Sequence, residues 1–202
     1  MAFIEVIAPQ RARGRLRELY AKVTGPGGQV DQVLQIHSLR PHTLQGHMSL
    51  YKAVLHHTGN RLPIWFLECI GVLVSRLNAC EYCEQHHAAG LRRLLRAESK
   101  DDDAYLAALA TATPGRPFTP RQRQALAYAR KLTLEPGGIG QADIEGLRQA
   151  GFDDGEILEI NQVAAYFAYA NRTVTGLGVS SEGEVLGLSP DAIEGEEHWH
   201  HD

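Results

Sequence analysis

Residues 63–77 read PIWFLECIGVLVSRL, and this run decides the fold that we expect for the chain. Pro63 suits the start of a helix, and apolar side chains then fall on nearly every side of it. A helix that is hydrophobic almost all round lies inside a protein, so we place this one at the centre. No stretch shows the alternating pattern of a half-buried strand between turn signals. The sequence therefore predicts an all-α protein.

Proline and glycine divide the rest of the chain into further helical segments. The expected helices cover residues 10–23, 30–38, 41–55, about 79–96, 104–110, 121–134, 141–150 and 153–177. The alanine-rich last helix is expected to pack tightly against the central one. We interpret residues 1–178 as a single helical domain with its core motif at 63–95. The acidic stretch 98–120 is the best candidate for an excursion or an internal boundary.

Residues 179–202 are predicted to form a C-terminal tail that is rich in Gly, Ser and Glu. It ends in EEHWHHD, which holds three of the ten histidines. We considered three roles for it: a flexible tail, adventitious metal binding, and docking on a neighbouring subunit through Trp199.

Composition and charge narrow the class of protein. The chain has 202 residues, 44% of them apolar, and a formal net charge of −4, which argues against a nucleic-acid surface. The first apolar run is short and is broken by Glu5, unlike a secretory signal. No window approaches the apolar length of a membrane span. We therefore expect a cytoplasmic protein with neither a nucleic-acid nor a membrane partner.

The central helix is followed by NACEYCEQHH, residues 78–87, which holds a C-x-x-C pair. At about 100° per residue, Cys80, Cys83 and His87 fall on one stripe of a helix, whereas His86 lies about a quarter turn away. The spacing therefore selects His87 as the base of the site. A cytoplasmic C-x-x-C pair is more often catalytic or metal-binding than a permanent bridge. Two thiols beside a base indicate redox chemistry.

Glu68 is the only acid between Pro63 and Asn78, and it lies twelve residues before Cys80. Burying a carboxylate without a partner is costly, so an acid in so apolar a helix needs a reason. We predict that Glu68 reaches the thiol and imidazole cluster, directly or through a water. The alternative is a place at the wet edge of the helix or an ion pair with an arginine such as Arg76.

These residue types suit thiol chemistry for definite reasons. Only the thiolate attacks, and a neutral imidazole can take the thiol proton. Attack on a peroxide gives a sulfenic acid, the second cysteine turns it into a disulfide, and an outside dithiol resets the pair. The helix terminus favours Cys80 as the attacker, whereas histidine spacing favours Cys83. We choose Cys83, because a base in contact should outweigh a dipole effect of about 1 kcal/mol.

Two other interpretations of the cysteines stay open. A C-x-x-C is also half of a zinc site, which His87 with Glu68 or His86 could complete. The pair could also be buried and inert. We assign no role to Cys69, which fits a small hydrophobe. The same holds for four histidines that flank the helix at 41–55 and fit surface or satisfied core positions: His42, His47, His56 and His57.

The residues quoted above resemble the active-site pattern of the AhpD-like alkylhydroperoxidases, within the carboxymuconolactone decarboxylase superfamily. The pattern is an acid (Glu68), a C-x-x-C pair twelve residues later, and a histidine (His87) four residues after the second cysteine. The chain is most similar to the peroxidase-related subgroup. The similarity lies in the sequence of residues 78–83, in the chain length and in the later segment 170–172, Ala-Asn-Arg.

The resemblance implies a multi-helical AhpD-like bundle that forms a homo-oligomer, a trimer or a hexamer, with sites near subunit contacts. It implies hydroperoxide reduction with Cys83 as the peroxidatic cysteine, Cys80 as the resolving one, His87 as base or proton relay and Glu68 as the acid behind it. No metal or organic cofactor is expected, and the reductant would be a lipoyl-type or thioredoxin-like dithiol. Tyr82 stands where the better-studied hydroperoxidases carry a histidine, which predicts a rewired relay.

Three alternative functions remain for the same residues. The chain could be a general disulfide oxidoreductase, a redox sensor, or a non-enzymatic oligomer that binds zinc through the cysteines.

Overall fold

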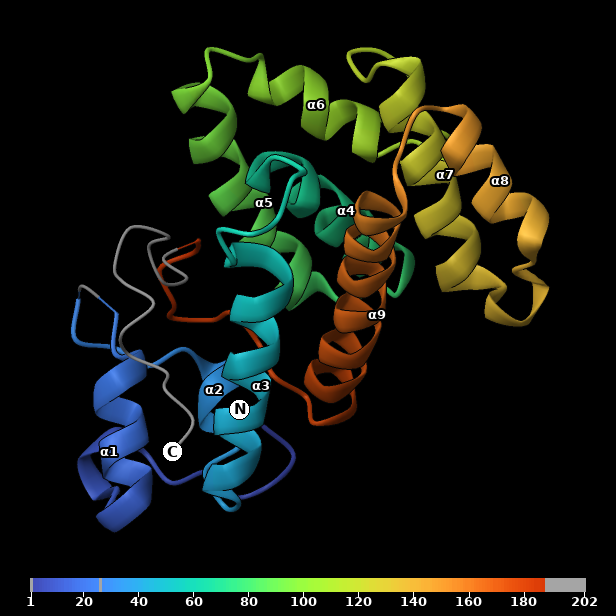
Figure 1. The fold of residues 1–202 in the computed structure, drawn as a ribbon. Coiled ribbons are helices and arrows are strands. Elements are labelled where there is room, and N and C mark those ends of the chain that lie inside the picture. Colours follow the sequence, from blue (N-terminus) through green and yellow to red (C-terminus); the bar gives the residue numbers. More distant parts are fainter. Residues whose placement is uncertain (1, 26, 188–202) are drawn as a thin grey trace.

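The computed structural model describes residues 2–25 and 27–187, and in this part of the chain all regular structure is helical. The prediction of an all-α protein is confirmed (Figure 1). The α-helices are α1 (Gly14–Val23), α2 (Gln32–Gln35), α3 (Pro41–Tyr51), α4 (Ile64–Leu77), α5 (Glu81–Ala97), α6 (Asp102–Leu109), α7 (Pro120–Leu134), α8 (Gln141–Gln149) and α9 (Asp154–Gly176). Short turns of 3-10 helix cover Pro9–Arg11 (η1) and Pro136–Gly138 (η3), and a π-helical turn covers Lys52–His56 (η2).

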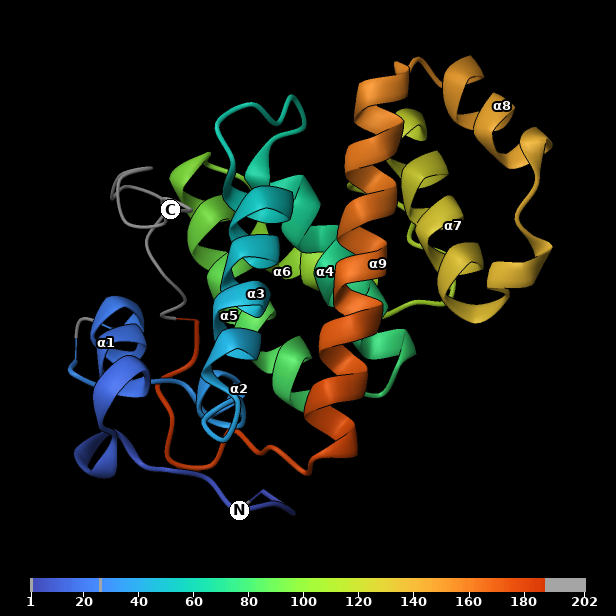
Figure 2. The same ribbon diagram turned by 60° about the horizontal axis from the view of Figure 1, so that its bottom comes forward.

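Helix α4 is the centre of the molecule, as its sequence predicts. Every residue from Trp65 to Ser75 is buried, and the helix packs against α5, α7 and α9. Both views show α9 running beside α4 (Figures 1 and 2). The two helices meet closely because Gly71 faces Phe167, and a Cβ atom on Gly71 would overlap that ring. The fold therefore holds α4 tightly on several sides.

Three of the expected helices differ from the structure. The segment predicted at 10–23 is η1 followed by α1, because the backbone turns at Gly14, where φ is +52°. The segment predicted at 30–38 is regular only over α2, after which tighter turns take its place, as in the bond from His37 N–H to the Leu34 carbonyl. The helix predicted at 41–55 becomes the π-helical turn η2 after Tyr51. A period of 3.6 residues carries no signal for such a turn.

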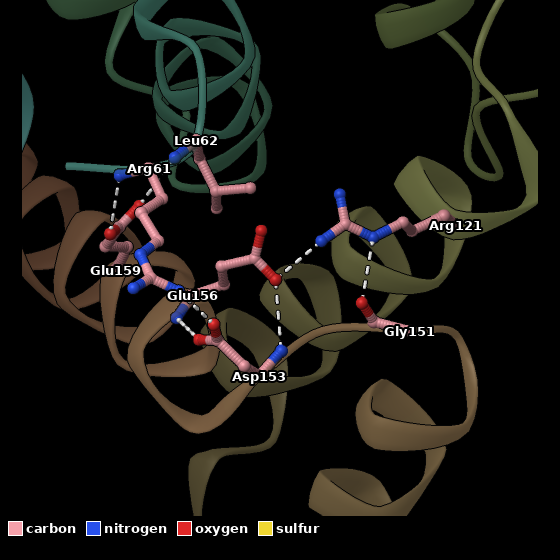
Figure 3. A network of polar contacts seen from close by, with 7 residues as sticks. All are labelled: Arg61, Leu62, Arg121, Gly151, Asp153, Glu156 and Glu159. Atoms are coloured by element: carbon pink, nitrogen blue, oxygen red, sulfur yellow. Dashed lines mark hydrogen bonds and ion pairs between the residues drawn. The ribbon is translucent and has the colours of Figure 1, made fainter.

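The loop before α4 is fixed to the start of α9 by a network of polar contacts (Figure 3). Both carboxylate oxygens of Glu159 accept backbone N–H groups, those of Arg61 and Leu62, at 2.9 Å. Asp153 caps α9 and also pairs with Arg61 at 2.8 Å. Glu156, Arg121 and Gly151 complete the network. The entry into α4, and with it the site that α4 carries, is thereby fixed in place.

The described end of the chain runs back over the first helices instead of leaving the molecule. After α9 this end of the chain, drawn in red, passes helix α2, drawn in blue (Figure 2). The Ser181 hydroxyl donates to Gln85 on α5 at 2.6 Å, and the Gln32 side chain donates to the Glu182 carbonyl. We call residues 179–187 the C-terminal segment. The predictions made for Trp199 and its neighbouring histidines lie outside the described residues.

None of the described helices combines the length and the apolar character that are needed to cross a lipid bilayer.

Candidate active site

The two cysteines sit where the chain turns from α4 into α5. Ala79 adopts a left-handed backbone with φ of 53°, and Cys80 is the N-cap residue of α5, with Cys83 in its first turn. Asn78 lies between the two helices as the C-cap of α4, and its side chain donates to Asn171 on α9 at 3.0 Å. The helical spacing that placed Cys80 and Cys83 on one stripe therefore does not apply, because Cys80 precedes the first residue of α5.

The side chains of Cys80 and Cys83 are hydrogen-bonded to each other, and both are buried free thiols. The bond from Cys83 lowers the pKa of Cys80 to about 6, against the opposing effect of burial. The Cys83 backbone N–H and the side chains of Thr175 and Asn171 add to this lowering. The same bond raises the pKa of Cys83, and burial and the charge on Cys80 act in the same direction. The pair thus shares one negative charge, held mainly on Cys80, and one proton, held mainly on Cys83.

Glu68 and His87, predicted from the sequence to share the site, are brought together between α4 and α5. Glu68 Oε2 lies 2.7 Å from His87 Nδ1, and the two side chains are only 6% and 15% exposed. A carboxylate can only accept a hydrogen bond, so the proton of this contact belongs to Nδ1. The other ring nitrogen, Nε2, is therefore the basic one. The alternative pairing of Glu68 with Arg76 does not occur, because Arg76 pairs with Glu84.

A second carboxylate and imidazole pair, which sequence reasoning missed, lies beside the first. His86 Nε2 is 2.9 Å from Oε2 of Glu184 in the C-terminal segment, and both side chains are less than 10% exposed. The Tyr82 ring stacks on His86, with 4.4 Å between ring centroids, and its hydroxyl is hydrogen-bonded to Glu184. Helical spacing places His86 about a quarter turn away from the stripe of the two cysteines and His87. A separation of 98 residues between His86 and Glu184 leaves no local signal for their contact.

The side chains of the C-x-x-C pair and of the two carboxylate and imidazole pairs, except those of Cys80 and Glu184, line a cavity of about 240 Å³. Of the two cysteines, Cys83 lines it, whereas Cys80 packs behind Cys83 among apolar side chains that include Val174. Both histidines of the carboxylate pairs reach the cavity, as does Glu68. The remaining lining is largely apolar and aromatic, with contributions from Met48, Tyr51, Ile64, Leu94, Tyr166 and Ala170. A small molecule in this cavity would meet the Cys83 sulfur and two imidazoles together.

Two further histidines on the cavity were given no role by the sequence. His47 is 5% exposed, and burial lowers its pKa to about 3, so its ring is neutral at physiological pH. Its Nδ1 atom is buried without a hydrogen-bond partner among the described residues, and the same is true of both ring nitrogens of His56. The π-helical turn η2 brings His56 to this place. These nitrogens can donate to or accept from a bound ligand.

The zinc alternative can be compared with the arrangement of possible ligands. Among residues 2–25 and 27–187, no group of three or more His, Cys, Asp or Glu side chains is placed to hold a metal ion. The remaining cysteine, Cys69, is fully buried in α4, and burial followed by the charge of Glu68 raises its pKa. It behaves as a small core residue, as the sequence suggested.

Comparisons with known proteins give no match to a family model and no match to a curated protein, whereas solved structures do match. An alkylhydroperoxidase AhpD core, peroxidase-related protein from Ralstonia eutropha JMP134 is 28% identical, with a TM-score of 0.69 over 89% of this chain and 91% of that chain. A peroxidase-related protein from Silicibacter sp. TM1040 is 29% identical, with a TM-score of 0.67 over 81% and 80%. The debrominase Bmp8, in complex with 2,3,4-tribromopyrrole, shares the fold at 15% identity, with a TM-score of 0.67 over 91% and 95%.

The neighbours above 25% identity are described as peroxidase-related, and one of them as an AhpD core. The pattern of Glu68, the C-x-x-C pair and His87 led to the same family from the sequence. The chain therefore has the AhpD-like fold, and its structural neighbours are AhpD-like, peroxidase-related proteins, consistent with the carboxymuconolactone decarboxylase superfamily.

Proposed function

We propose that this chain is an enzyme, a thiol-dependent peroxidase that reduces hydroperoxides through Cys80 and Cys83. One observation carries the proposal: the Cys83 thiol lines a small cavity together with the Glu68-paired imidazole of His87, and it is hydrogen-bonded to a second thiol. The AhpD-like, peroxidase-related neighbours support a general peroxidase-like, antioxidant role.

The first half-reaction assigns the attack to Cys83, because this cysteine reaches the cavity. Its proton, held in the bond to Cys80, must first move to Cys80 or to Nε2 of His87. The Cys83 thiolate then attacks one peroxide oxygen and the O–O bond breaks. Cys83 becomes a sulfenic acid, and the departing alkoxide takes up the displaced proton to leave as an alcohol.

The second half-reaction assigns resolution to Cys80. A pKa of about 6 keeps Cys80 largely as a thiolate at neutral pH, in contact with Cys83. Its sulfur attacks the sulfenic sulfur, the S–O bond breaks, and the departing hydroxide takes up a proton from solvent to become water. One thiolate, one thiol, one hydroperoxide and this proton thus give one disulfide, one alcohol and one water. An external dithiol restores the pair by thiol–disulfide exchange and is itself oxidised.

The test compares two kinds of substrate with the same dithiol donor, dihydrolipoamide. The proposal predicts sustained turnover of hydrogen peroxide or cumene hydroperoxide, and much slower turnover of a small-molecule disulfide such as oxidised glutathione. Cys69→Ala is the matched control, because it removes a thiol outside the site. Turnover of the disulfide alone would make the chain a disulfide oxidoreductase. Oxidation of the pair without turnover would make it a redox sensor.

A second candidate is the thiol-dependent reduction of a compact aromatic molecule. The observation that favours it is the neutral, unpartnered imidazole nitrogens of His47 and His56 beside aromatic rings in the cavity. With a bromoarene, two thiols would give the hydrogen-substituted arene, one disulfide and hydrogen bromide. Bromide release from tribromopyrrole, measured beside peroxide turnover, decides between the two candidates.

We also infer that the chain works as a homo-oligomer, a trimer or a hexamer. The inference comes from the family resemblance, and light scattering on the purified protein tests it. A monomer at micromolar concentration would contradict it.

A further inference from the structure

The C-terminal segment brings a carboxylate to the site from outside the helical motif. Glu184 Oε1 accepts the backbone N–H of Gln32 at the start of α2, and Oε2 faces His86. The same carboxylate is hydrogen-bonded to the hydroxyl of Tyr82, which lies between the two cysteines, directly before Cys83. Gly187, farther along the segment, lines the cavity. One side chain therefore joins α2, α5 and the end of the described chain.

We propose that Glu184 is a positioning residue of the thiol site, which fixes His86 as a second proton-transferring imidazole of the cavity. This inference rests on the proposed function for its role in catalysis. The positioning itself can be tested without any turnover.

The two imidazoles are held in opposite forms. Glu68 accepts from Nδ1 of His87, which leaves Nε2 as its basic nitrogen. Glu184 accepts from Nε2 of His86, which leaves Nδ1 as its basic nitrogen. Both rings line the cavity that Cys83 reaches. The fold thus presents two bases of fixed orientation to one pocket that Cys83 also lines.

The reaction supplies a reason for two bases. One proton must reach each of two different oxygens, one leaving as an alcohol and one as water: the first comes from Cys83 and the second from solvent. The pair of Glu68 and His87 can carry one of them, and the pair of Glu184 and His86 can carry the other. Tyr82, stacked on His86 and bonded to Glu184, keeps the second ring in place.

The groups that face Glu184 support an ionised carboxylate. Burial opposes its ionisation, but bonds from His86, the Gln32 N–H and Tyr82 outweigh burial and lower its pKa. Asp31, in the loop before α2, is the nearby like charge. Burial and then the charge of Glu184 raise the pKa of Asp31. Of these two acids, Glu184 is therefore the one that stays charged as the pH falls.

The kinetic test compares Glu184→Gln with Glu182→Gln, an exposed control in the same segment. Losing the outer carboxylate behind a metal-ligating histidine typically costs 10- to 100-fold in activity, and we take the lower end of that range for His86. We expect Glu184→Gln to lower kcat for hydrogen peroxide about 10-fold and to change its pH profile, with KM and the melting temperature nearly unchanged. The Glu182→Gln control should match the parent. Unchanged kcat and pH profile in Glu184→Gln would overturn the proposal.

The test that needs no turnover is nitrogen NMR of the histidine rings above their titration range. We expect the Nε2–H form for His86 and the Nδ1–H form for His87. Glu184→Gln should remove the single form of His86 and leave His87 as it was, because an amide can either donate or accept. An Nδ1–H form of His86 in the parent, or no change in the variant, would overturn the positioning. If the parent shows the expected forms but turns over no peroxide, only the proposed function fails.

Discussion

The two carboxylate and imidazole pairs show two different ways of building one site. Glu68 and His87 lie on α4 and α5, and α4 is buried along its whole middle. Glu184 comes from a segment without regular structure, held to the rest of the molecule largely by polar contacts, whereas its partner His86 is on α5. The inner pair is therefore part of the core, and we expect the outer pair to depend on a segment that opens locally while the core stays folded.

This difference leads us to expect unequal contributions to catalysis. The largest predicted effect belongs to the inner pair: Glu68→Gln or His87→Gln should lower kcat/KM for hydrogen peroxide about 10²- to 10⁴-fold, the range for losing general acid–base catalysis. Glu184→Gln should cost about 10-fold. Steady-state kinetics of the three variants measures both. Equal losses at Glu68 and Glu184 would break the distinction between inner and outer pairs.

The next effect concerns the charge that the two cysteines share. In the parent, the Cys80 thiolate should form as the pH rises through about 6, because the bond from Cys83 stabilises the anion. Cys83→Ala removes the largest cause of that lowering, so the pKa of Cys80 should rise by about 2 units, towards the ordinary thiol value. Thiolate absorbance against pH measures it. Glu184→Gln should leave the curve unchanged, and a shift as large as that of Cys83→Ala would contradict this separation.

A glycine-to-alanine substitution can be made both in the core and in the C-terminal segment, and its effects on stability and on kcat should differ between the two. Gly71→Ala would overlap Phe167 in the core, and overpacking costs about 1–3 kcal/mol of unfolding free energy. Gly187→Ala would place a Cβ atom 2.8 Å from Ala89 Cβ, at a backbone φ of +72° that disfavours alanine. We expect it to displace the segment and lower kcat with little change in global stability. Denaturant unfolding beside kinetics tells the two apart, and global destabilisation by Gly187→Ala would count against a separable segment.

The smallest predicted effect is the response of the segment to acid. The pKa of Glu184 is lowered in the folded state, so its stabilising contribution is present above the ordinary glutamate pKa of about 4.3. That contribution is lost as the pH falls through the lower, folded value. The protection of the Gln32 backbone N–H, which donates to Glu184, against hydrogen exchange should therefore fall in acid before that of the Cys80 N–H, which donates to the Ser75 carbonyl. Protection that falls at both N–H groups together would show that the segment does not open on its own.

The inner half of the site could be predicted from the sequence because its signals are local. The helices expected at 63–77 and to about 96 correspond closely to α4 and α5. Glu68 stood out because an acid in an apolar helix needs a partner, and the structure provides His87. Composition, periodicity and the cost of burying charge were sufficient for this part.

The rest of the site depends on backbone details and distant contacts that no spacing encodes. The left-handed turn at Ala79 moves Cys80 out of the helix, and a π-helical turn brings His56 to the cavity. His86 gained its importance from Glu184, in a stretch that composition describes only as a tail. The one local hint was Tyr82 in place of a histidine, which predicted a rewired relay without indicating the carboxylate involved.

The assignment of the attacking sulfur is the claim on which the account depends. The most direct measurement treats reduced Cys80→Ser with one equivalent of hydrogen peroxide and a sulfenic-acid probe, and locates the adduct by peptide mass spectrometry. The account predicts a single adduct on Cys83 in this variant, and a disulfide between Cys80 and Cys83 in the parent. An unlabelled Cys83, together with a sulfenic acid on Cys80 in the reciprocal Cys83→Ser variant, would contradict it.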